Sequence, residues 1–355
     1  MSENIENGAS TESTQSTGRR AARPTVQAAR EPVLEARNVT VTFEGKSRDG
    51  HRTTVVACDD VSLQLGAGEI VALVGESGSG KTTLARALAL HQDIDEGEIL
   101  LNGRRVALSG PDKVVPRKYY GDVQMIFQDP FASLNHLKTI RHIIGRAVTL
   151  HSGLKGRKAI EQRTLELLEA VHLTPATDYI DRYPSALSGG QRQRISIARA
   201  LAVDPTVILA DEPTSMLDVS IRIDVLNLLD ELRRDKGVSI LYITHDIASA
   251  RYISDRMAVM YKGEMVELGE TDQVVLSPRH DYTRTLIDAA PNPQRRTRRS
   301  RRRRQAAQEH SPLRPRADQA PATPHGSAAQ GSAPHDSTAR GSTSHDPTSE
   351  GPTHD

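Results

Sequence analysis

The stretch Gly75-Glu76-Ser77-Gly78-Ser79-Gly80-Lys81-Thr82 decides the fold of this chain, because it fits the phosphate-loop pattern between a strand and a helix. The apolar run at residues 69–74 indicates a short buried strand, and we expect a helix to begin at Thr82. Glycines let the backbone wrap closely around phosphate oxygens, and the helix N-terminus adds a positive end to the anion site. The alternative is a glycine-rich turn that binds nothing. The flanking strand and helix favour a nucleotide site.

Three side chains of this loop have predicted roles toward the nucleotide. Lys81 would neutralise charge on the β- and γ-phosphates, and the Thr82 hydroxyl would bind Mg²⁺. Thr83 is placed to reach the region of the α-phosphate. The predicted nucleotide-binding residues of the loop are Gly75, Glu76, Ser77, Gly78, Ser79, Gly80, Lys81, Thr82 and Thr83.

A second apolar run, residues 207–210, ends in the acidic pair Asp211-Glu212. In a phosphate-loop protein, Asp211 would hold Mg²⁺ through water, and Glu212 would orient or deprotonate the attacking water. A strand that ends in a solvated acidic turn is the alternative. The presence of Lys81 favours the catalytic interpretation.

Two further apolar runs end in polar side chains. Residues 239–244 lead to His245, and residues 122–127 lead to Gln128. Ligands of open α/β sheets collect at the carboxyl edge of parallel strands, so His245 is placed to sense the γ-phosphate. Gln128 offers a neutral oxygen to Mg²⁺ and a donor to water. A surface histidine with no role is the alternative for His245, and a glutamine after a strand does not by itself indicate a site. The predicted catalytic residues are Lys81, Gln128, Glu212 and His245, and the predicted metal ligands are Thr82, Gln128 and Asp211.

The stretch Leu187-Ser188-Gly189-Gly190-Gln191 precedes an amphipathic helical pattern that we expect from Arg192 to Val203. A helix N-terminus made by a serine and two glycines can receive a phosphate. Because residues 75–83 already serve one nucleotide, this second anion site would serve the ATP bound to another copy or a paralogue. A simple N-cap by Ser188 is the alternative, and it would not explain the pair of glycines.

In this order, the motifs resemble the ATP-binding cassette family over nearly the whole body of the chain. The resemblance implies an α/β fold with a phosphate-loop NTPase (RecA-like) core. An antiparallel β subdomain is expected near residues 34–65, and an α-helical subdomain is expected as an insertion at about residues 128–187. In transporters of this family the insertion docks on membrane subunits. The resemblance also implies that Phe43 stacks on adenine, that Asp218 belongs to a dimer-contact loop, and that Ser188, Gly189, Gly190 and Gln191 bind nucleotide.

Residues 131–133 and 190–194 resemble the second of the two ATPase subunits of the oligopeptide/dipeptide importer subgroup. Three stretches resemble the subgroup as a whole, and they are residues 128–135, 218–221 and 277–286. The last lies in a C-terminal extension, about residues 268–293, that is typical of the subgroup. Many relatives carry a cysteine-ligated iron–sulfur cluster there. Because the single cysteine of this chain is Cys58, we predict no cluster.

Composition limits what else the chain contains. It has 355 residues and a net charge of +1, and its single cysteine excludes an internal disulfide. No apolar run approaches the ~18 to 20 residues needed to cross a bilayer, so we expect a chain that does not span a membrane by itself. Residues 1–30 and 294–355 lack apolar periodicity, and we expect them to form disordered tails around a body at 31–293. The arginine-rich run at 295–304 fits either a membrane contact or a solubilising linker.

The resemblance implies an ATPase that binds ATP and Mg²⁺ and pairs with a second ATPase subunit, either a paralogue or an identical copy. Two membrane-spanning permease subunits and an extracytoplasmic binding protein would complete the importer, with this chain peripheral at the cytoplasmic face. Peptides are the expected substrate, with oligosaccharides or nickel as alternatives, and nucleic acid is not an expected partner. A soluble ATPase of the same superfamily is the competing function. A phosphate-loop kinase or GTPase would have no use for residues 187–191.

Overall fold

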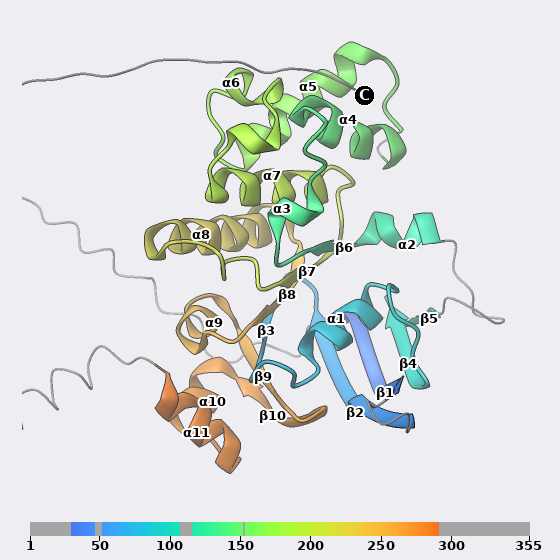
Figure 1. The fold of residues 1–355 in the computed structure, drawn as a ribbon, viewed down its shortest axis with the longest axis vertical. Coiled ribbons are helices and arrows are strands. Elements are labelled where there is room, and N and C mark those ends of the chain that lie inside the picture. The colour runs from blue at the N-terminus through green and yellow to red at the C-terminus, as the bar shows by residue number, and fades with distance from the viewer. Residues whose placement is uncertain (1–29, 47–51, 107–115, 152, 291–355) are drawn as a thin grey trace, which may run out of the picture. The chain divides into compact units, whose positions relative to one another are not determined.

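Two β-sheets and a layer of helices make up the described part of the chain, residues 30–46, 52–106, 116–151 and 153–290 of a computed structural model (Figure 1). These residues belong to one unit that ends at Asn292. The predicted tails, apart from Arg30, and the arginine-rich run at 295–304 lie outside the described residues.

The larger sheet has six strands in the order β10-β9-β3-β8-β7-β6. Neighbouring strands from β9 to β6 are parallel, and β10 pairs antiparallel with β9 at the edge. Every residue of β3, β7 and β8 is buried, which explains why these strands are continuous apolar runs in the sequence. The strands are β3 (Ile70–Val74), β6 (Val123–Ile126), β7 (Val207–Asp211), β8 (Ser239–Thr244), β9 (Arg256–Tyr261) and β10 (Glu264–Glu270).

The smaller sheet is antiparallel, in the order β2-β1-β4-β5. Its long strands β1 (Pro32–Lys46) and β2 (Arg52–Gly66) lie where the antiparallel layer was predicted. The hairpin of β4 (Glu96–Leu101) and β5 (Arg104–Val106) was not predicted. A signal was present, because Asn102 and Gly103 form its turn with φ of 49° and 71°, and an Asn-Gly pair favours this kind of hairpin.

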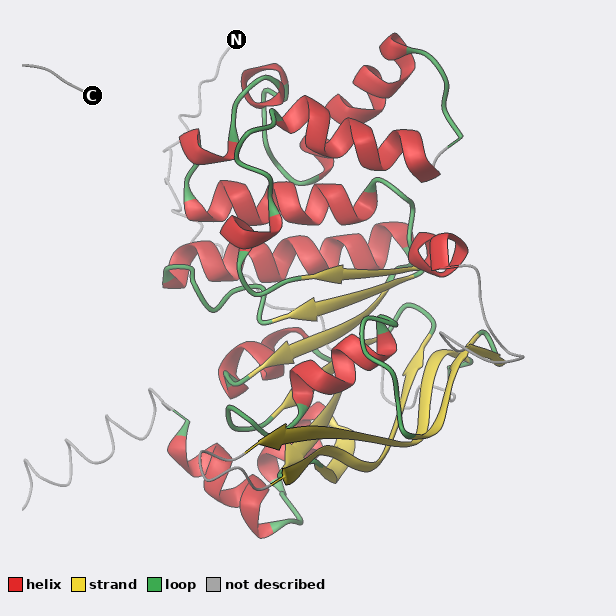
Figure 2. Cartoon of the chain, turned by 45° about the vertical axis from the view of Figure 1, so that its right-hand side comes forward, coloured by secondary structure: helices red, strands yellow, loops and turns green. Residues whose placement is uncertain are grey.

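The helices lie on both sides of the larger sheet, and several stack above it in Figure 2. One buried cluster joins the helical insertion and α8 to one face of the sheet, and a second joins α1 and the antiparallel strands to the other face. Within the described ranges, no helix combines the length and apolar character that a membrane crossing needs. The helices are α1 (Lys81–Leu88), α2 (Pro116–Asp122), α3 (Pro130–Ser133), α4 (Ile140–His151), α5 (Arg157–Ala170), α6 (Thr177–Ile180), the 3₁₀ turn η1 (Pro184–Ala186), α7 (Gly189–Leu201), α8 (Val219–Lys236), α9 (Ile247–Ile253), α10 (Thr271–Leu276) and α11 (Asp281–Ala289).

Two predicted helix boundaries were wrong by a few residues. The helix after the phosphate loop begins at Lys81 rather than Thr82. The helix α7 runs from Gly189 to Leu201 rather than from Arg192 to Val203. Its earlier start follows from Ser188, which caps the helix and so brings both glycines into the first turn.

Candidate nucleotide-binding site

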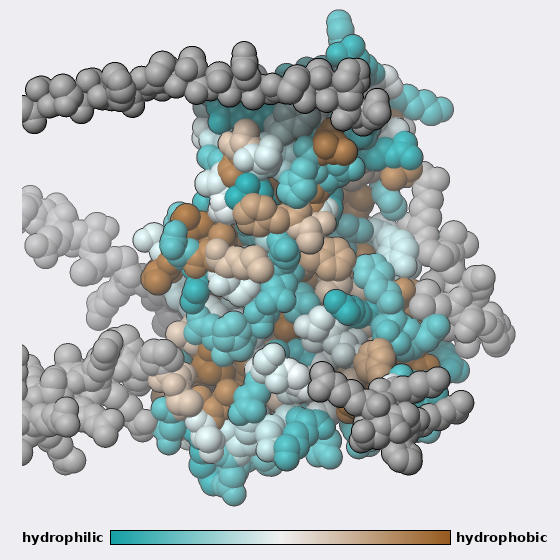
Figure 3. Space-filling model, in the orientation of Figure 1, coloured by the Kyte–Doolittle hydropathy of each residue, from teal (hydrophilic) through white to brown (hydrophobic). Residues whose placement is uncertain are grey.

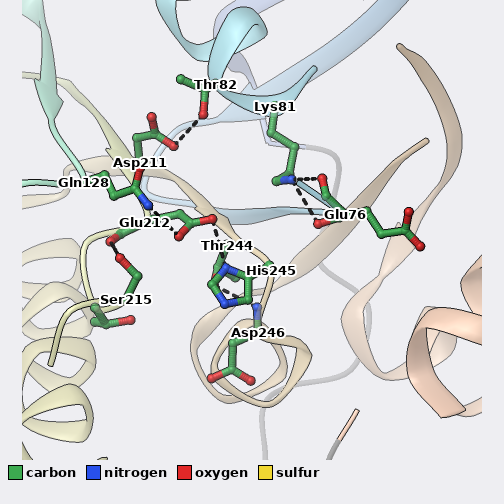
Figure 4. Close-up of polar contacts among 12 residues, drawn as sticks. Glu76, Lys81, Thr82, Gln128, Asp211, Glu212, Ser215, Thr244, His245 and Asp246 are labelled. Atoms are coloured by element: carbon green, nitrogen blue, oxygen red, sulfur yellow. Dashed lines mark hydrogen bonds and ion pairs between the residues drawn. The ribbon is translucent and has the colours of Figure 1, made fainter. Parts of the chain in front are cut away.

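The phosphate loop lies between β3 and α1, and Lys81 folds back over it (Figure 4). The Lys81 ammonium donates to the carbonyl oxygens of Gly75 at 2.9 Å and Glu76 at 2.6 Å, and to the Ser79 hydroxyl at 3.3 Å. Burial lowers the pKa of Lys81, and the carboxylates of Glu212, Asp211 and Glu76 oppose that shift. A cation held among carbonyl oxygens in this way is placed to exchange them for phosphate oxygens.

Two glycines hold the loop close to neighbouring backbone. A Cβ atom at Gly75, whose φ is 154°, would lie 2.2 Å from the carbonyl oxygen of Met260. One at Gly80, with φ of 102°, would lie 2.1 Å from the carbonyl oxygen of Ala57. Side chains are therefore excluded at both positions, and the loop is wedged between the end of β9 and the antiparallel strand β2.

The predicted metal ligands Thr82 and Asp211 lie in contact. The Thr82 hydroxyl donates to Asp211 Oδ1 at 3.2 Å, and Asp211 is only 4% exposed. Burial raises the pKa of Asp211, while the hydrogen bond from Thr82 opposes this shift. A buried carboxylate beside a hydroxyl oxygen, next to a phosphate loop, is the donor set that Mg²⁺ prefers. These two residues therefore fit the predicted metal site.

The predicted catalytic side chains Gln128, Glu212 and His245 meet at the carboxyl edge of the sheet (Figure 4). Gln128 Nε2 donates to Glu212 Oε2 at 3.1 Å, and His245 Nδ1 lies 2.9 Å from Glu212 Oε1. They follow the neighbouring strands β6, β7 and β8, which explains the convergence. The Glu212 backbone has a φ of 44°, uncommon for a residue with a side chain. Because the Gln128 nitrogen faces Glu212, its role as a metal ligand through oxygen stays a prediction.

The serine–glycine corner at the start of α7 forms an N-cap within the chain. Ser188 Oγ accepts from the Gln191 N–H at 3.3 Å, and Gln191 Oε1 accepts from the Ser188 N–H at 2.9 Å, which is a capping box. Among the described residues, no hydrogen bond joins this corner to the phosphate loop. The corner therefore has no direct bond to the site that its own chain builds.

The pair of glycines in this corner has a partial structural explanation, which comes from helix packing and not from the N-cap. A Cβ at Gly190 would lie 2.5 Å from Ile221 Cγ2 on α8, so packing of α7 against α8 requires glycine there. At Gly189 the nearest atom would be Leu217 Cδ2 at 3.6 Å, an ordinary contact. Packing therefore accounts for the second glycine and not for the first.

Phe43 and Asp218 are both exposed, as contact residues should be. Phe43 lies on β1 opposite Val55 of β2 and is 42% exposed. Further along β2, the Cys58 thiol lies 3.7 Å from the carbonyl oxygen of Gly80, so this sheet touches the phosphate loop. Asp218 is the N-cap residue of α8 and is exposed to solvent.

A residue without a predicted role links two of these motifs. Arg222 on α8 donates to the Asp246 carboxylate at 3.0 Å, next to His245, and to the carbonyl oxygen of Leu217 at 3.5 Å. Arg222 therefore joins the loop before α8 to the segment that follows β8. The sequence offered no signal for this link, because the contacts depend on how α8 and α9 pack.

Comparisons with known proteins show which family this chain belongs to. Residues 58–215 match the family described as ABC transporter, and residues 266–316 match the C-terminal region of oligopeptide/dipeptide transporters. The oligopeptide transport ATP-binding protein OppF of Streptococcus mutans is 44% identical over 265 residues, which cover 74% of this chain and 83% of that protein. OppF of Bacillus subtilis is 47% identical over 242 residues, covering 68% and 78%. This chain belongs to the ABC transporter family, whose members bind ATP.

A longer relative and a solved structure extend the comparison. The glutathione import ATP-binding protein GsiA of Escherichia coli is 47% identical over 263 residues, but these cover only 41% of GsiA. The ATP-binding cassette MJ0796, solved as a dimer in a post-hydrolysis state with ADP and Pi, has a TM-score of 0.59 and 28% identity, covering 67% of this chain and 98% of that one. The predicted fold class, a phosphate-loop NTPase core with an antiparallel β subdomain and an inserted helical subdomain, is confirmed.

Proposed function

We propose that this chain is the ATP-hydrolysing subunit of an ABC importer that takes up oligopeptides or dipeptides. The observation that carries the enzymatic part is the hydrogen-bonded meeting of Gln128, Glu212 and His245 beside Lys81. The match of residues 266–316 to oligopeptide/dipeptide transporters, together with two relatives named for oligopeptide transport, supports the substrate class.

In the proposed reaction, water attacks the γ-phosphorus of ATP and the bond to the β-phosphate oxygen breaks, which gives ADP and phosphate. Glu212 accepts the proton of the attacking water, and Gln128 and His245 hold the carboxylate in place. Lys81 moves from the loop carbonyls to the β- and γ-phosphates, and His245 contacts the γ-phosphate. Thr82 and Asp211, with Gln128 as a further donor, would hold Mg²⁺, which supplies positive charge against the triphosphate.

We further propose that two cassettes close around each nucleotide. Ser188, Gly189, Gly190 and Gln191 of one cassette would face the γ-phosphate on the other, and Asp218 would contact the partner. The exposed apolar side chains beside Asp218 support this, since Met216 is 57%, Val219 71% and Ile223 45% exposed. Figure 3 shows brown, hydrophobic residues at the left edge of the molecule, in the region where Figure 1 labels α8. The partner cassette is a paralogue or a second copy of this chain.

At the membrane, the helical subdomain would dock on two permease subunits, with the chain peripheral at the cytoplasmic face and an extracytoplasmic binding protein delivering substrate. Cys58, the single cysteine, lies buried in β2 and not in the C-terminal extension, so the proposal includes no iron–sulfur cluster. Nucleic acid is not among the proposed partners.

The proposed function predicts which proteins bind this chain in its own cell and which substrate is taken up. When the tagged full-length chain is purified from detergent-solubilised membranes, two multi-span proteins are expected to co-purify with it, because the proposed ATPase subunit docks on two permease subunits. A strain lacking the chain is expected to lose uptake of a labelled tripeptide while uptake of nickel and oligosaccharide stays unchanged. If the chain were recovered only from the soluble fraction, with no multi-span partner, the importer role would be contradicted. If the strain lacking the chain kept peptide uptake but lost nickel uptake, the proposed substrate class would be contradicted.

The adenine contact gives a second prediction. Replacing Phe43 by Ala is expected to weaken binding of a fluorescent ATP analogue by about tenfold, since stacking on a base contributes ~1 to 3 kcal/mol. Phe43→Tyr keeps a ring of similar size and is expected to bind as the unchanged chain does. Equal affinities for Phe43→Ala and the unchanged chain, measured by titration, would remove Phe43 from the adenine site.

A further inference from the structure

The C-terminal extension reaches the phosphate loop through one side chain. The backbone N–H of Glu76, the second residue of the loop, donates to the hydroxyl oxygen of Tyr282 on α11 at 2.9 Å. These residues are 206 positions apart in the sequence. Nothing in the catalytic scheme above uses Tyr282, so the contact needs its own explanation.

The turn before α11 fixes where this tyrosine lies. The carboxylate of Glu267 on β10 accepts from the backbone N–H groups of Arg279 at 2.9 Å and His280 at 3.1 Å. His280 then caps α11, because its Nδ1 accepts from the Tyr282 N–H at 3.1 Å. The edge strand therefore anchors the start of the helix, and with it the backbone of Tyr282.

The tyrosine ring is fixed as well. It stacks on Tyr261, the last residue of β9, with ring centroids 4.0 Å apart and planes tilted by 27°. Strand β9 pairs with β3, which leads into the phosphate loop, and the N–H of Gly263 in the turn after β9 donates to the carbonyl oxygen of Ser79 at 3.1 Å. Tyr282 and the β9–β10 turn therefore both hydrogen-bond to the backbone of the phosphate loop, at Glu76 and at Ser79 respectively.

The two ends of one peptide group explain what this contact does. The carbonyl oxygen of Gly75 accepts from Lys81 at 2.9 Å, and the N–H of the same peptide, on Glu76, donates to Tyr282. Lys81 and Tyr282 therefore fix the plane of the Gly75–Glu76 peptide from opposite sides. When Lys81 leaves this carbonyl for a phosphate, the bond to Tyr282 is the hydrogen bond among the described residues that still holds this peptide.

We propose that Tyr282 is a positioning residue for nucleotide binding: its hydroxyl holds the Gly75–Glu76 peptide so that the phosphate loop keeps its binding shape while Lys81 changes partners. A loop held in this way loses less conformational freedom when the triphosphate binds, which raises affinity. Once bound, the phosphates themselves order the loop, so the effect lies in binding and not in the chemical step. This role rests on the proposed nucleotide site.

The test is Tyr282→Phe in the full-length chain, which removes the hydroxyl and keeps the ring on Tyr261. Loss of one hydrogen bond is expected to weaken binding of the fluorescent analogue MANT-ATP by about threefold to tenfold and to raise the KM for ATP similarly. The kcat is expected to stay within about twofold of the unchanged chain. Amide hydrogen exchange at Glu76, measured without nucleotide, is expected to become faster.

A matched variant separates this role from general loss of a tyrosine hydroxyl. Tyr252→Phe removes a hydroxyl that donates to Asn227 Oδ1 at 2.7 Å, between α9 and α8, and it is expected to leave MANT-ATP affinity and Glu76 exchange unchanged. Unchanged affinity and exchange in Tyr282→Phe, with normal binding by the unchanged chain, would overturn the role of Tyr282 alone. Failure of the unchanged chain to bind MANT-ATP would overturn the proposed function and this role with it.

Discussion

Glu212→Gln in the full-length chain is expected to lower ATP hydrolysis by about 10²- to 10⁴-fold, the contribution typical of a positioned base, and to leave ATP binding intact. The Glu212 carboxylate lies between Gln128 and His245. A glutamine amide has the same size and shape, so it fits there without any movement of its neighbours. It cannot take up the proton of water. Steady-state release of phosphate measures the rate, and MANT-ATP titration measures binding.

The control for this variant is Glu264→Gln, because Glu264 is an exposed glutamate on the edge strand β10, outside the site. It is expected to hydrolyse ATP at the unchanged rate. If Glu212→Gln also kept that rate, Glu212 would not be the catalytic base, and only Asp211 of the acidic pair would keep a proposed role.

Lys81→Ala is expected to lose both binding and turnover, in contrast to Glu212→Gln. The ammonium is the main positive charge placed for the β- and γ-phosphates, and removal of such a group from a buried site costs on the order of 10²- to 10³-fold in rate. The variant also removes the Lys81 hydrogen bond from the carbonyl oxygens of Gly75 and Glu76, although Glu76 still accepts from the Ser79 N–H at 3.2 Å. We expect MANT-ATP affinity and phosphate release to fall together.

Lys158→Ala is the matched control, since Lys158 is an exposed lysine on α5 in the helical subdomain. It is expected to bind and hydrolyse ATP normally. A Lys81→Ala chain with unchanged affinity and rate would mean that residues 75–83 do not hold the triphosphate, and the nucleotide would have to be sought elsewhere.

The strand ends of the site could be predicted from sequence because their strands are buried on both faces. Continuous apolar runs identified β3, β7 and β8, and the parallel arrangement then brings the residues after them to one edge. These two properties of the sequence suffice to predict that Lys81, Glu212 and His245 share one site. The β4–β5 hairpin was missed because its strands are short and partly exposed, although its Asn-Gly turn was readable.

Contacts between distant segments could not be predicted in the same way. Tyr282 binds a backbone N–H group, which leaves no trace in the identity of Glu76. The clash that requires Gly190 depends on how close α7 and α8 approach, and that distance is set by packing. Whether Ser188 faces a nucleotide on another cassette is a property of two chains, so it stays a prediction.

The close fit of Gly75 and Gly80 against Met260 and Ala57 has a consequence for degenerate copies of this gene. A side chain at either position would force the loop or its neighbours to move, whether or not the chain ever meets ATP. A duplicate that had lost Glu212 but still relied on this fold is expected to retain both glycines. In such duplicates we expect Gly75 and Gly80 to remain after ATPase activity is lost, whereas Glu212 and His245 would be substituted first.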